Sequence, residues 1–532
     1  MSSRIGLAVA VGLGLAALVA GPGATPAQKY GGVFRTMLSS SPPSLSIHDE
    51  ATIYTQMPVM PVYNNLALYD PFRKQEGQET IIPELATEWA WDADHRRLTF
   101  KLRQGVKWHD GKPFTAADVK HTFDVVRGKA KQRLKLNPRR LWYQNVEDVT
   151  TKGDHEVTFH LQRPQPALLG MLSSGFSPIY PAHVAPSQLR SQTMGTGPFK
   201  LKVYTPDQAV ELEKNPDYWL KGRPYLDGVH LAIIRKRSTR LAHLISGKAD
   251  MEVPYQVTEP IKRQLEKDIP NIQFQLNSSG VSTNLIFNTK KPPFDNPKLR
   301  KAVALALDRN GLVKGLYSGV SIAGGGAMLP APYGAWGMPE ELMAQVPGMG
   351  DGARNKEAAR QIMRELGYGP EKPLQVQISA RNLVTYTDPA TWAISELKQV
   401  YVEAVLEAVE SGNWHGKVAR RDFQIGMNRT ANGGDEPDIT FYEHYACKSQ
   451  RNYSDFCDSE LERKVDAQSQ EVDVAKRKAL VNEIDLALQQ AGARPMLLHT
   501  TAYVAYYPHV KNFVLHQIGY SQYRMQEIWL DK

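Results

Sequence analysis

Hydrophobic and polar residues alternate with a period of two in two segments of the first third of the chain. Leu98, Phe100 and Leu102 occupy every second position before Gly105, and residues 157–161 repeat the pattern after a turn-forming Lys-Gly-Asp sequence. A period of two places the apolar side chains on one face of a half-buried strand. The pattern therefore predicts two strands that pair as antiparallel neighbours.

Four other segments carry apolar residues at steps of three and four, which is typical of helices with one buried face. Their start signals are Thr115 with Asp118, which resembles a capping box, Asn296 before Pro297, Asn355, and Asp473. Gly367 is the expected left-handed stop of the third helix, and the fourth is expected to run to Gly492. Strands and helices interleave without strict alternation, which predicts a mixed α/β class. Glycine and proline clusters at 324–333, 347–352 and 433–437 predict loops.

The length of 532 residues and the apolar content of 42% predict two or more lobes of unequal size, because single hydrophobic cores stop growing at about 250–300 residues. Residues 1–27 have the pattern of a secretory signal peptide, with Arg4, an apolar run over 5–20 and small residues before Gln28. The alternative is a membrane anchor, but the run is shorter than the roughly 20 residues of a span. We expect cleavage before Gln28 and, since no cysteine is near, no lipid anchor.

Cys447 and Cys457 are the only cysteines, ten positions apart in a chain expected to be exported. This spacing favours a local disulfide over two free buried thiols. The net charge of +9 is spread along the chain, which favours solvated faces over a nucleic-acid surface. We therefore expect no nucleic-acid partner.

Motifs of catalysis do not emerge from the sequence. The histidines do not form the two-histidine helix motif of zinc hydrolases, and the surroundings of Ser318 lack the pattern of a nucleophile elbow. The glycine run 324–326 is not followed by the lysine of a phosphate loop. We expect no enzymatic activity, no metal and no cofactor.

The segment LTFKLRQGVKWHDGKPFTAADV at residues 98–119 closely resembles the signature of the family 5 extracellular solute-binding proteins of ABC importers. Supporting matches follow in the family's order, among them PELATEW at 83–89, GTGPF at 195–199, NPDYW at 215–219 and GKAD at 247–250. The family includes dipeptide-, oligopeptide- and nickel-binding components. The resemblance implies the α/β, two-lobed periplasmic-binding-protein fold of type II, with an extra inserted domain and a hinge between the lobes.

The domain boundaries that the resemblance implies are discontinuous. We expect a first lobe at 28–66, 195–281 and 501–532, an inserted domain at 67–194, and a second lobe at 282–500.

The function implied is that of a periplasmic substrate-binding component of an ABC importer. It would capture a peptide-like, opine-like or other polar solute by hinge closure and deliver it to the permease transmembrane subunits, as a monomer. Two alternatives remain open at this point. One is an exported hydrolase on the same fold, and the other is a sensory or chaperone-like binding protein that feeds a receptor.

Candidate ligand contacts come from loops that would face the cleft. In peptide-binding relatives an aspartate four residues before the proline of such a loop binds the peptide ammonium, but here that position is Gly433. Asp435 would replace it only if the loop is reshaped. Arg381, just after a predicted strand at 374–379, resembles the arginine that dipeptide binders keep for a carboxylate. Further candidates, each equally compatible with a core or surface role, are Tyr255, Trp336, Trp392, Trp414, Asn428, Arg429 and Tyr442.

Overall fold

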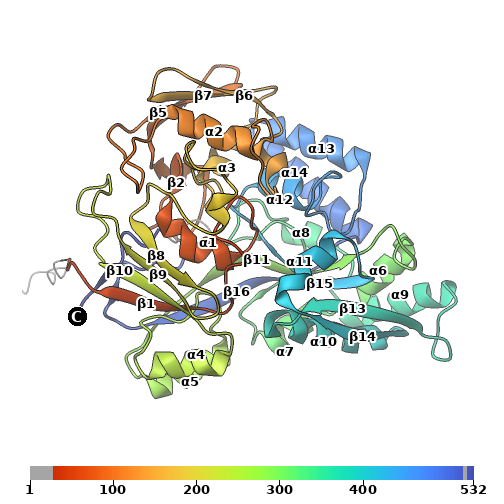
Figure 1. The fold of residues 1–532 in the computed structure, drawn as a ribbon. Helices are drawn as coiled ribbons and strands as arrows, with labels where there is room; N and C mark the ends of the chain where they lie inside the picture. The colour runs from red at the N-terminus through yellow and green to blue at the C-terminus, as the bar shows by residue number, and fades with distance from the viewer. Residues whose placement is uncertain (1–27, 519–523) are drawn as a thin grey trace, which may run out of the picture.

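The computed structural model describes residues 28–518 and 524–532, and the predicted signal peptide at 1–27 lies outside them (Figure 1). Its first sheet has the strand order β1, β10, β9, β8, in which β1 is parallel to β10. The strands are β1 (Val33–Leu38), β8 (Phe199–Thr205), β9 (Ala209–Lys214) and β10 (Gly228–Ile233). The helices α4 (Arg237–Ile245) and α5 (Glu259–Asp268) lie beside this sheet, at the bottom of Figure 1.

A second four-stranded sheet has the order β4, β5, β7, β6 and lies at the top of Figure 1. Its strands are β4 (Ala86–Trp91), β5 (Arg97–Leu102), β6 (Val146–Thr151) and β7 (Glu156–Leu161). The antiparallel pairing predicted from the period-two pattern is confirmed, since Leu98 lies opposite Phe159. Helix α2 (Ala116–Val126) covers this sheet, and its Phe123 ring contacts Phe159 at 4.9 Å between centroids.

The other elements of the first 198 residues are short. They comprise α1 (Ile53–Val59), β2 (Ala67–Tyr69), β3 (Ile81–Pro83) and α3 (Leu168–Ser173), with short 3₁₀ helices at Met60–Val62, Gln78–Thr80, Arg140–Tyr143 and Gln188–Arg190.

The third sheet is six-stranded, with the order β12, β16, β11, β15, β13, β14. Its strands are β11 (Gln273–Phe287), β12 (Ile322–Ala323), β13 (Leu374–Arg381), β14 (Val402–Val409), β15 (Ile425–Ala431) and β16 (Met496–Tyr506). Helices α6 (Pro297–Ala306), α7 (Arg309–Leu316), α9 (Gly352–Glu365) and α10 (Val384–Lys398) surround it. Apolar residues of these elements form a separate core around Leu285, Val303 and Ile378.

The remaining elements lie between strands of the third sheet in chain order or close the chain. They are α8 (Glu340–Met343), α11 (Ser411–Ala419), α12 (Pro437–His444), α13 (Ser459–Gln470), α14 (Val474–Ala491), β17 (Val510–Lys511) and β18 (Trp529–Leu530). In the described part of the chain, no helix is both long and apolar enough to cross a membrane.

Most of the predicted element ends are confirmed. Thr115 and Asp118 form the capping box of α2, Asn296 caps α6, and Asp473 caps α14. Gly367 and Gly492 have φ angles of 82° and 66°, in the left-handed region that favours glycine.

Two predicted boundaries are wrong. Helix α9 begins at Gly352 rather than Asn355, because the Asp351 side chain accepts from the N–H groups of Ala353 at 2.9 Å and Arg354 at 3.1 Å. The predicted loop at 347–352 loses only Gly352 to the helix. Strand β13 continues through Arg381 instead of ending at residue 379, because the ladder with β14 extends to the Arg381 and Val409 pair.

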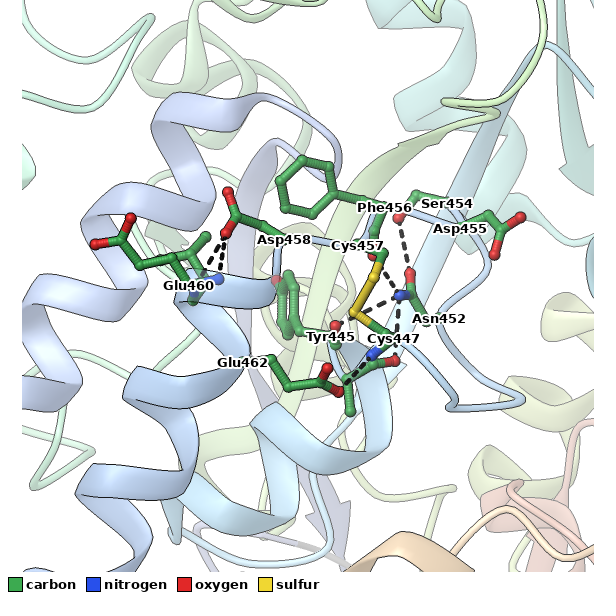
Figure 2. The surroundings of a disulfide bond; sticks show 12 residues. Tyr445, Cys447, Asn452, Ser454, Asp455, Phe456, Cys457, Asp458, Glu460 and Glu462 are labelled. Atoms are coloured by element: carbon green, nitrogen blue, oxygen red, sulfur yellow. Dashed lines mark hydrogen bonds between the residues drawn. A yellow bond between two sulfur atoms is a disulfide. The ribbon is translucent and has the colours of Figure 1, made fainter.

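The predicted disulfide between Cys447 and Cys457 is confirmed (Figure 2). It closes a loop between α12 and α13. Within that loop the Asn452 side-chain amide donates to the carbonyl of Phe456 at 2.7 Å, and the Cys447 N–H donates to Glu462 at 3.1 Å. Closing so short a loop stabilises the fold by on the order of 2–3 kcal/mol. The disulfide therefore fixes the segment that carries Arg451.

Strands β11 and β16 are shared by the two halves of the molecule. The first half of β11 pairs with the end of β16, which bridges to Met251 and Val257 beside the first sheet, and the second half of β11 pairs with β15. The β11–β16 register shifts between Ser278 and Ser282, where Gly280 has a φ of 63°. This irregularity weakens the ladder where it passes between the halves.

Candidate functional site

A cleft with three connected chambers lies between the first and third sheets. The inner chamber has a cavity volume of about 120 Å³, the side chamber about 100 Å³ and the outer chamber about 630 Å³. Gln256 and Thr385 line all three, so the chambers are continuous. Residues 51–54 and 254–256 form one wall, and side chains from β13, β15, α10 and α11 form the opposite wall.

Arg381 reaches the inner chamber from the end of β13. Its Nε donates to the Ser411 hydroxyl at 2.9 Å, and its guanidinium lies 5.6 Å from the ring centroid of Tyr54 on the opposite wall. The residue is 8% exposed, and within the described residues it forms no ion pair. Arg381 is therefore a buried cation held by neutral partners.

Arg429 enters the same chamber from β15, and its neighbour Asn428 points away from it. Arg429 donates to the Thr500 hydroxyl at 3.1 Å, whereas its buried Nε finds no hydrogen-bond partner in the part of the chain that the structure describes. Asn428 instead donates to Asn284 at 3.2 Å and Thr430 at 3.1 Å. The alternation of a strand explains the difference, because successive side chains face opposite sides.

Arg451 and His415 complete the basic lining of the inner chamber. The Arg451 guanidinium pairs with Glu443 of α12 at 2.5 Å. Burial, together with the charges of Arg381 and Arg451, lowers the pKa of His415 from 6.5 to about 3. At neutral pH His415 is uncharged, and its depressed pKa reports an environment that disfavours additional positive charge.

Tyr255 lines the inner and side chambers. Its backbone has a left-handed φ of 59°, and its hydroxyl donates to the carbonyl of His516. The other aromatic candidates lie elsewhere. Trp414 is 1% exposed in a small core with Val418, and Trp392 packs against the core of the third sheet. Trp336 stacks on the Arg477 guanidinium and Tyr442 donates to Asp466. The structure thus brings Tyr255, Arg381 and Arg429 together; ligand contact by any candidate stays a prediction.

Gly433 follows β15 and packs against Trp142 of one 3₁₀ helix and against Ser174 and Phe176, which follow α3. The Ser174 hydroxyl donates to the Gly433 carbonyl at 2.6 Å. A Cβ atom at Gly433 would lie 2.9 Å from both the Ser174 hydroxyl and the Trp142 ring. This backbone therefore has no room for an aspartate at the position where peptide-binding relatives carry one.

Asp435 does not reach the inner chamber, since its carboxylate accepts from the N–H of Ala335 at 2.7 Å. Burial raises the pKa of the Asp435 carboxyl from 3.8 to about 7, and the charge of Glu436 also raises it, while the hydrogen bonds of Ala335 and Gln517 and the charge of Lys478 lower it. Asp435 therefore takes up a proton on folding between about pH 4 and 7.

Because the pKa of Asp435 is raised, we expect the difference in unfolding free energy between the wild type and Asp435→Asn to depend on pH. Its stabilising contribution is complete below about pH 4 and is lost as the pH rises through about 7. From pH 5 to pH 8 we expect the wild type to lose on the order of 1–2 kcal/mol of unfolding free energy relative to the variant, less than the full shift because Asp435 is only partly buried. Urea unfolding at both pH values measures this. Asp207→Asn is the control, because the hydrogen bond from Arg235 lowers the pKa of Asp207; equal differences at both pH values for Asp435→Asn would refute the assignment.

Several lining residues were not among the predictions. Tyr54 and Gln256 are held through Ser39, which contacts the Tyr54 hydroxyl at 3.0 Å and accepts from Gln256 at 3.0 Å. Their segments carry no motif that would have marked them. For Arg451 the sequence contained one signal that could have identified it, namely the cysteine pair that fixes its loop. Among the described residues, no group of three or more His, Cys, Asp or Glu side chains is placed to hold a metal ion.

Comparisons with known proteins agree over almost the whole chain. The family model described as bacterial extracellular solute-binding proteins, family 5 Middle, matches residues 80–452. The dipeptide-binding protein of Escherichia coli K12 is 24% identical over 491 residues, which cover 86% of this chain and 88% of that protein.

Solved structures show the same fold. A Helicobacter pylori periplasmic binding protein in complex with the peptide STSA superposes with a TM-score of 0.84 at 20% identity, covering 95% of this chain and 99% of that one. An A. tumefaciens R10 binding protein in complex with agropinic acid has a TM-score of 0.79 at 22% identity, with coverage of 94% and 99%. The predicted periplasmic-binding-protein fold is confirmed, and the chain belongs to family 5 of the bacterial extracellular solute-binding proteins.

Proposed function

We propose that the protein is the periplasmic substrate-binding component of an ABC importer, which captures a small peptide-like, opine-like or other polar solute and delivers it to the permease. The observation that carries this proposal is the continuous cleft, whose walls come from both halves of the molecule. A solute in the inner chamber would contact Tyr54 and Gln256 on one wall and Arg381 and Arg429 on the other. It would therefore bind fully only when the halves are closed.

The hinge in this proposal lies in β11 and β16. The expected boundaries of the second lobe, 281/282 and 500/501, fall beside the register shift at residues 278–282. The proposed lobes are 28–66 with 195–281 and 501–532, and 282–500, with 67–194 as the inserted domain. Converting a population that is 1% closed into one that is 99% closed requires about 5.5 kcal/mol of differential binding. Charge-assisted contacts to the buried Arg381 and the half-buried Arg429 are strong enough to supply much of it.

Ligand titration combined with solution scattering tests this function. We would titrate the purified protein with peptides, opines, sugars and metal chelates, and follow both its unfolding midpoint and its radius of gyration. We expect one ligand class to stabilise the protein by about 2.7 kcal/mol at one hundred times Kd and to reduce the radius of gyration. Arg364→Met, far from the cleft, should respond like the wild type. Unchanged stability and dimensions with every solute would contradict the proposal.

A further inference from the structure

The charged side chains that line the inner chamber are all basic. They are Arg381, Arg429 and Arg451, and neither aspartate nor glutamate is among the described residues that line this chamber. The charge of Arg451 is neutralised by its ion pair with Glu443, which does not line the chamber. Arg381 and Arg429 form no ion pair within the described residues, so the chamber holds two guanidinium charges without compensation.

Such charges are costly in the absence of a ligand. Removing a guanidinium from water costs several kcal/mol unless an anion or a full set of hydrogen bonds replaces the water. Arg381 is 8% exposed and has a hydrogen bond only through Nε among the described residues, and the buried Nε of Arg429 has none. An anion in the chamber would supply the missing acceptors, because a carboxylate matches the fork of N–H donors of arginine.

The acidic groups near the chamber are committed elsewhere. Glu436 pairs with Arg477, and Asp435 accepts from Ala335 outside the chamber. The loop position of Gly433 has no room for a carboxylate side chain. The other carboxylates of the cleft line the side and outer chambers: Glu259 accepts from Arg263 at 3.3 Å, Asp388 is exposed, and Glu410 accepts from Asn382 at 2.9 Å. A ligand ammonium in the inner chamber would therefore meet two unpaired arginines and no acid.

The approach to the chamber is also basic. The outer chamber is lined by Arg235, Lys236 and Arg237, of which Arg235 pairs with Asp207. Lys236 and Arg237 form no ion pair within the described residues. In the outer chamber these cations outnumber Glu410, and a cleft with an excess of one sign of charge raises the local concentration of ligands of the opposite sign. The entrance and the inner chamber thus select for the same charge.

We infer that the solute is a small organic anion with at least two acidic groups and no free ammonium group in the inner chamber, held by Arg381 and Arg429. N-blocked acidic peptides and opine-type acids whose nitrogen is acylated have this chemistry. The inference rests on the proposed function, because it names the class of solute that the same cleft would take.

Matched ligands test the inference without any mutation. Isothermal titration of the purified protein would compare N-acetylated acidic dipeptides, the same dipeptides with a free amino terminus, the same acetylated dipeptides with both carboxylates amidated, opine-type acids, and neutral sugars. We expect binding by acetylated or opine-type acids, with amidation weakening it by at least about 30-fold and a free amino group giving no gain. Tighter binding of the free amine, equal binding of the amide, or no binding by any acid would overturn the inference.

The same panel separates this inference from the proposed function. Binding of the amidated dipeptides or of neutral sugars alone would overturn the anion assignment and leave solute capture intact, whereas no binding in any arm would overturn both. Arg429→Gln adds a second readout. It should weaken the acidic ligand by at least about 30-fold and leave the Kd of the amide nearly unchanged, while Arg364→Gln should change neither. An equal effect of Arg429→Gln on acid and amide would contradict a direct contact.

Discussion

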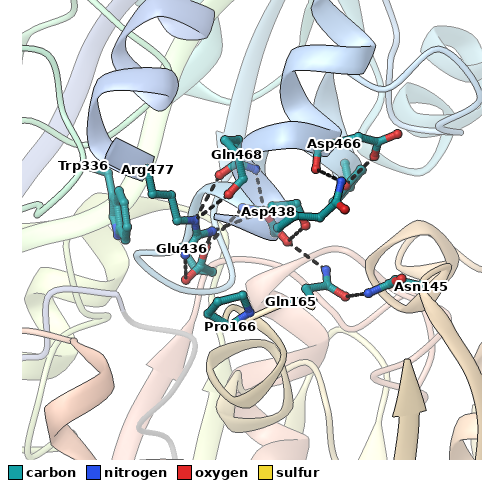
Figure 3. Close-up of polar contacts among 12 residues, drawn as sticks. Asn145, Gln165, Pro166, Trp336, Glu436, Asp438, Asp466, Gln468 and Arg477 are labelled. Atoms are coloured by element: carbon teal, nitrogen blue, oxygen red, sulfur yellow. Dashed lines mark hydrogen bonds and ion pairs between the residues drawn. The ribbon is translucent and has the colours of Figure 1, made fainter. Parts of the chain in front are cut away.

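Replacing Arg477 with methionine should lower the free energy of unfolding by about 3–5 kcal/mol, because it leaves two buried carboxylates without their cation. Figure 3 shows the arrangement, in which Arg477 of α14 pairs with Glu436 and lies 3.3 Å from Asp438 at the start of α12. The three side chains are at most 3% exposed. Methionine fills similar volume, so the measured loss reports the charge rather than a cavity. Urea unfolding at pH 7 gives the difference.

The control for this prediction is Arg364→Met. Arg364 also pairs with a carboxylate, that of Glu357, but the two side chains are 49% and 59% exposed. Exposed pairs contribute about 0–1 kcal/mol. If the two variants lost the same small amount of stability, the Arg477 network would not be the structural link between α12 and α14 that its burial indicates.

The sequence was most informative where the structural signal is local. The ends of α14 follow from Asp473, which accepts from the N–H groups of Ala475 and Lys476, and from Gly492, whose left-handed backbone stops the helix. Each of these contacts spans three residues or fewer. The pairing of β5 with β7 followed from alternation in two nearby segments. Such features were predictable because the energies that decide them involve neighbours in the chain.

The site was less predictable because it is built from distant segments. Asn428 and Arg429 are adjacent, and alternation requires that only one of them faces the chamber, but both faces of this part of β15 are lined by polar residues and the sequence does not distinguish them. Whether position 433 has room for an acidic side chain depends on Ser174 and Trp142, which are more than 250 positions away in the sequence. Only the packing of Ser174 and Trp142 against this loop shows that an acid has no room there.

Arg381→Met should have the opposite effect to Arg477→Met, because it should weaken ligand binding without lowering the unfolding free energy. We expect the Kd for the acidic ligand to rise by about 30-fold to 3,000-fold, since truncating one partner of a buried charge pair costs about 2–5 kcal/mol. The ligand-free protein should keep its unfolding free energy or gain some, because the mutation removes a buried charge that no carboxylate compensates. Ser411 is partly exposed, so water replaces the hydrogen bond that it loses.

Two measurements on one variant decide the role of Arg381, namely isothermal titration for affinity and urea unfolding for stability. Arg381→Lys keeps the charge but loses the fork of donors, so its affinity should fall between those of the wild type and Arg381→Met. If Arg381 had a structural role, its replacement would lower the stability and the ligand affinity of the protein together. Arg477→Met should likewise lower the stability. An arginine that binds the ligand lowers the stability of the free protein and raises the affinity. The cost of burying its charge is offset only when the anion enters the cleft. Loss of stability in Arg381→Met with unchanged affinity would assign this side chain to the fold and remove the main contact on which the anion site depends.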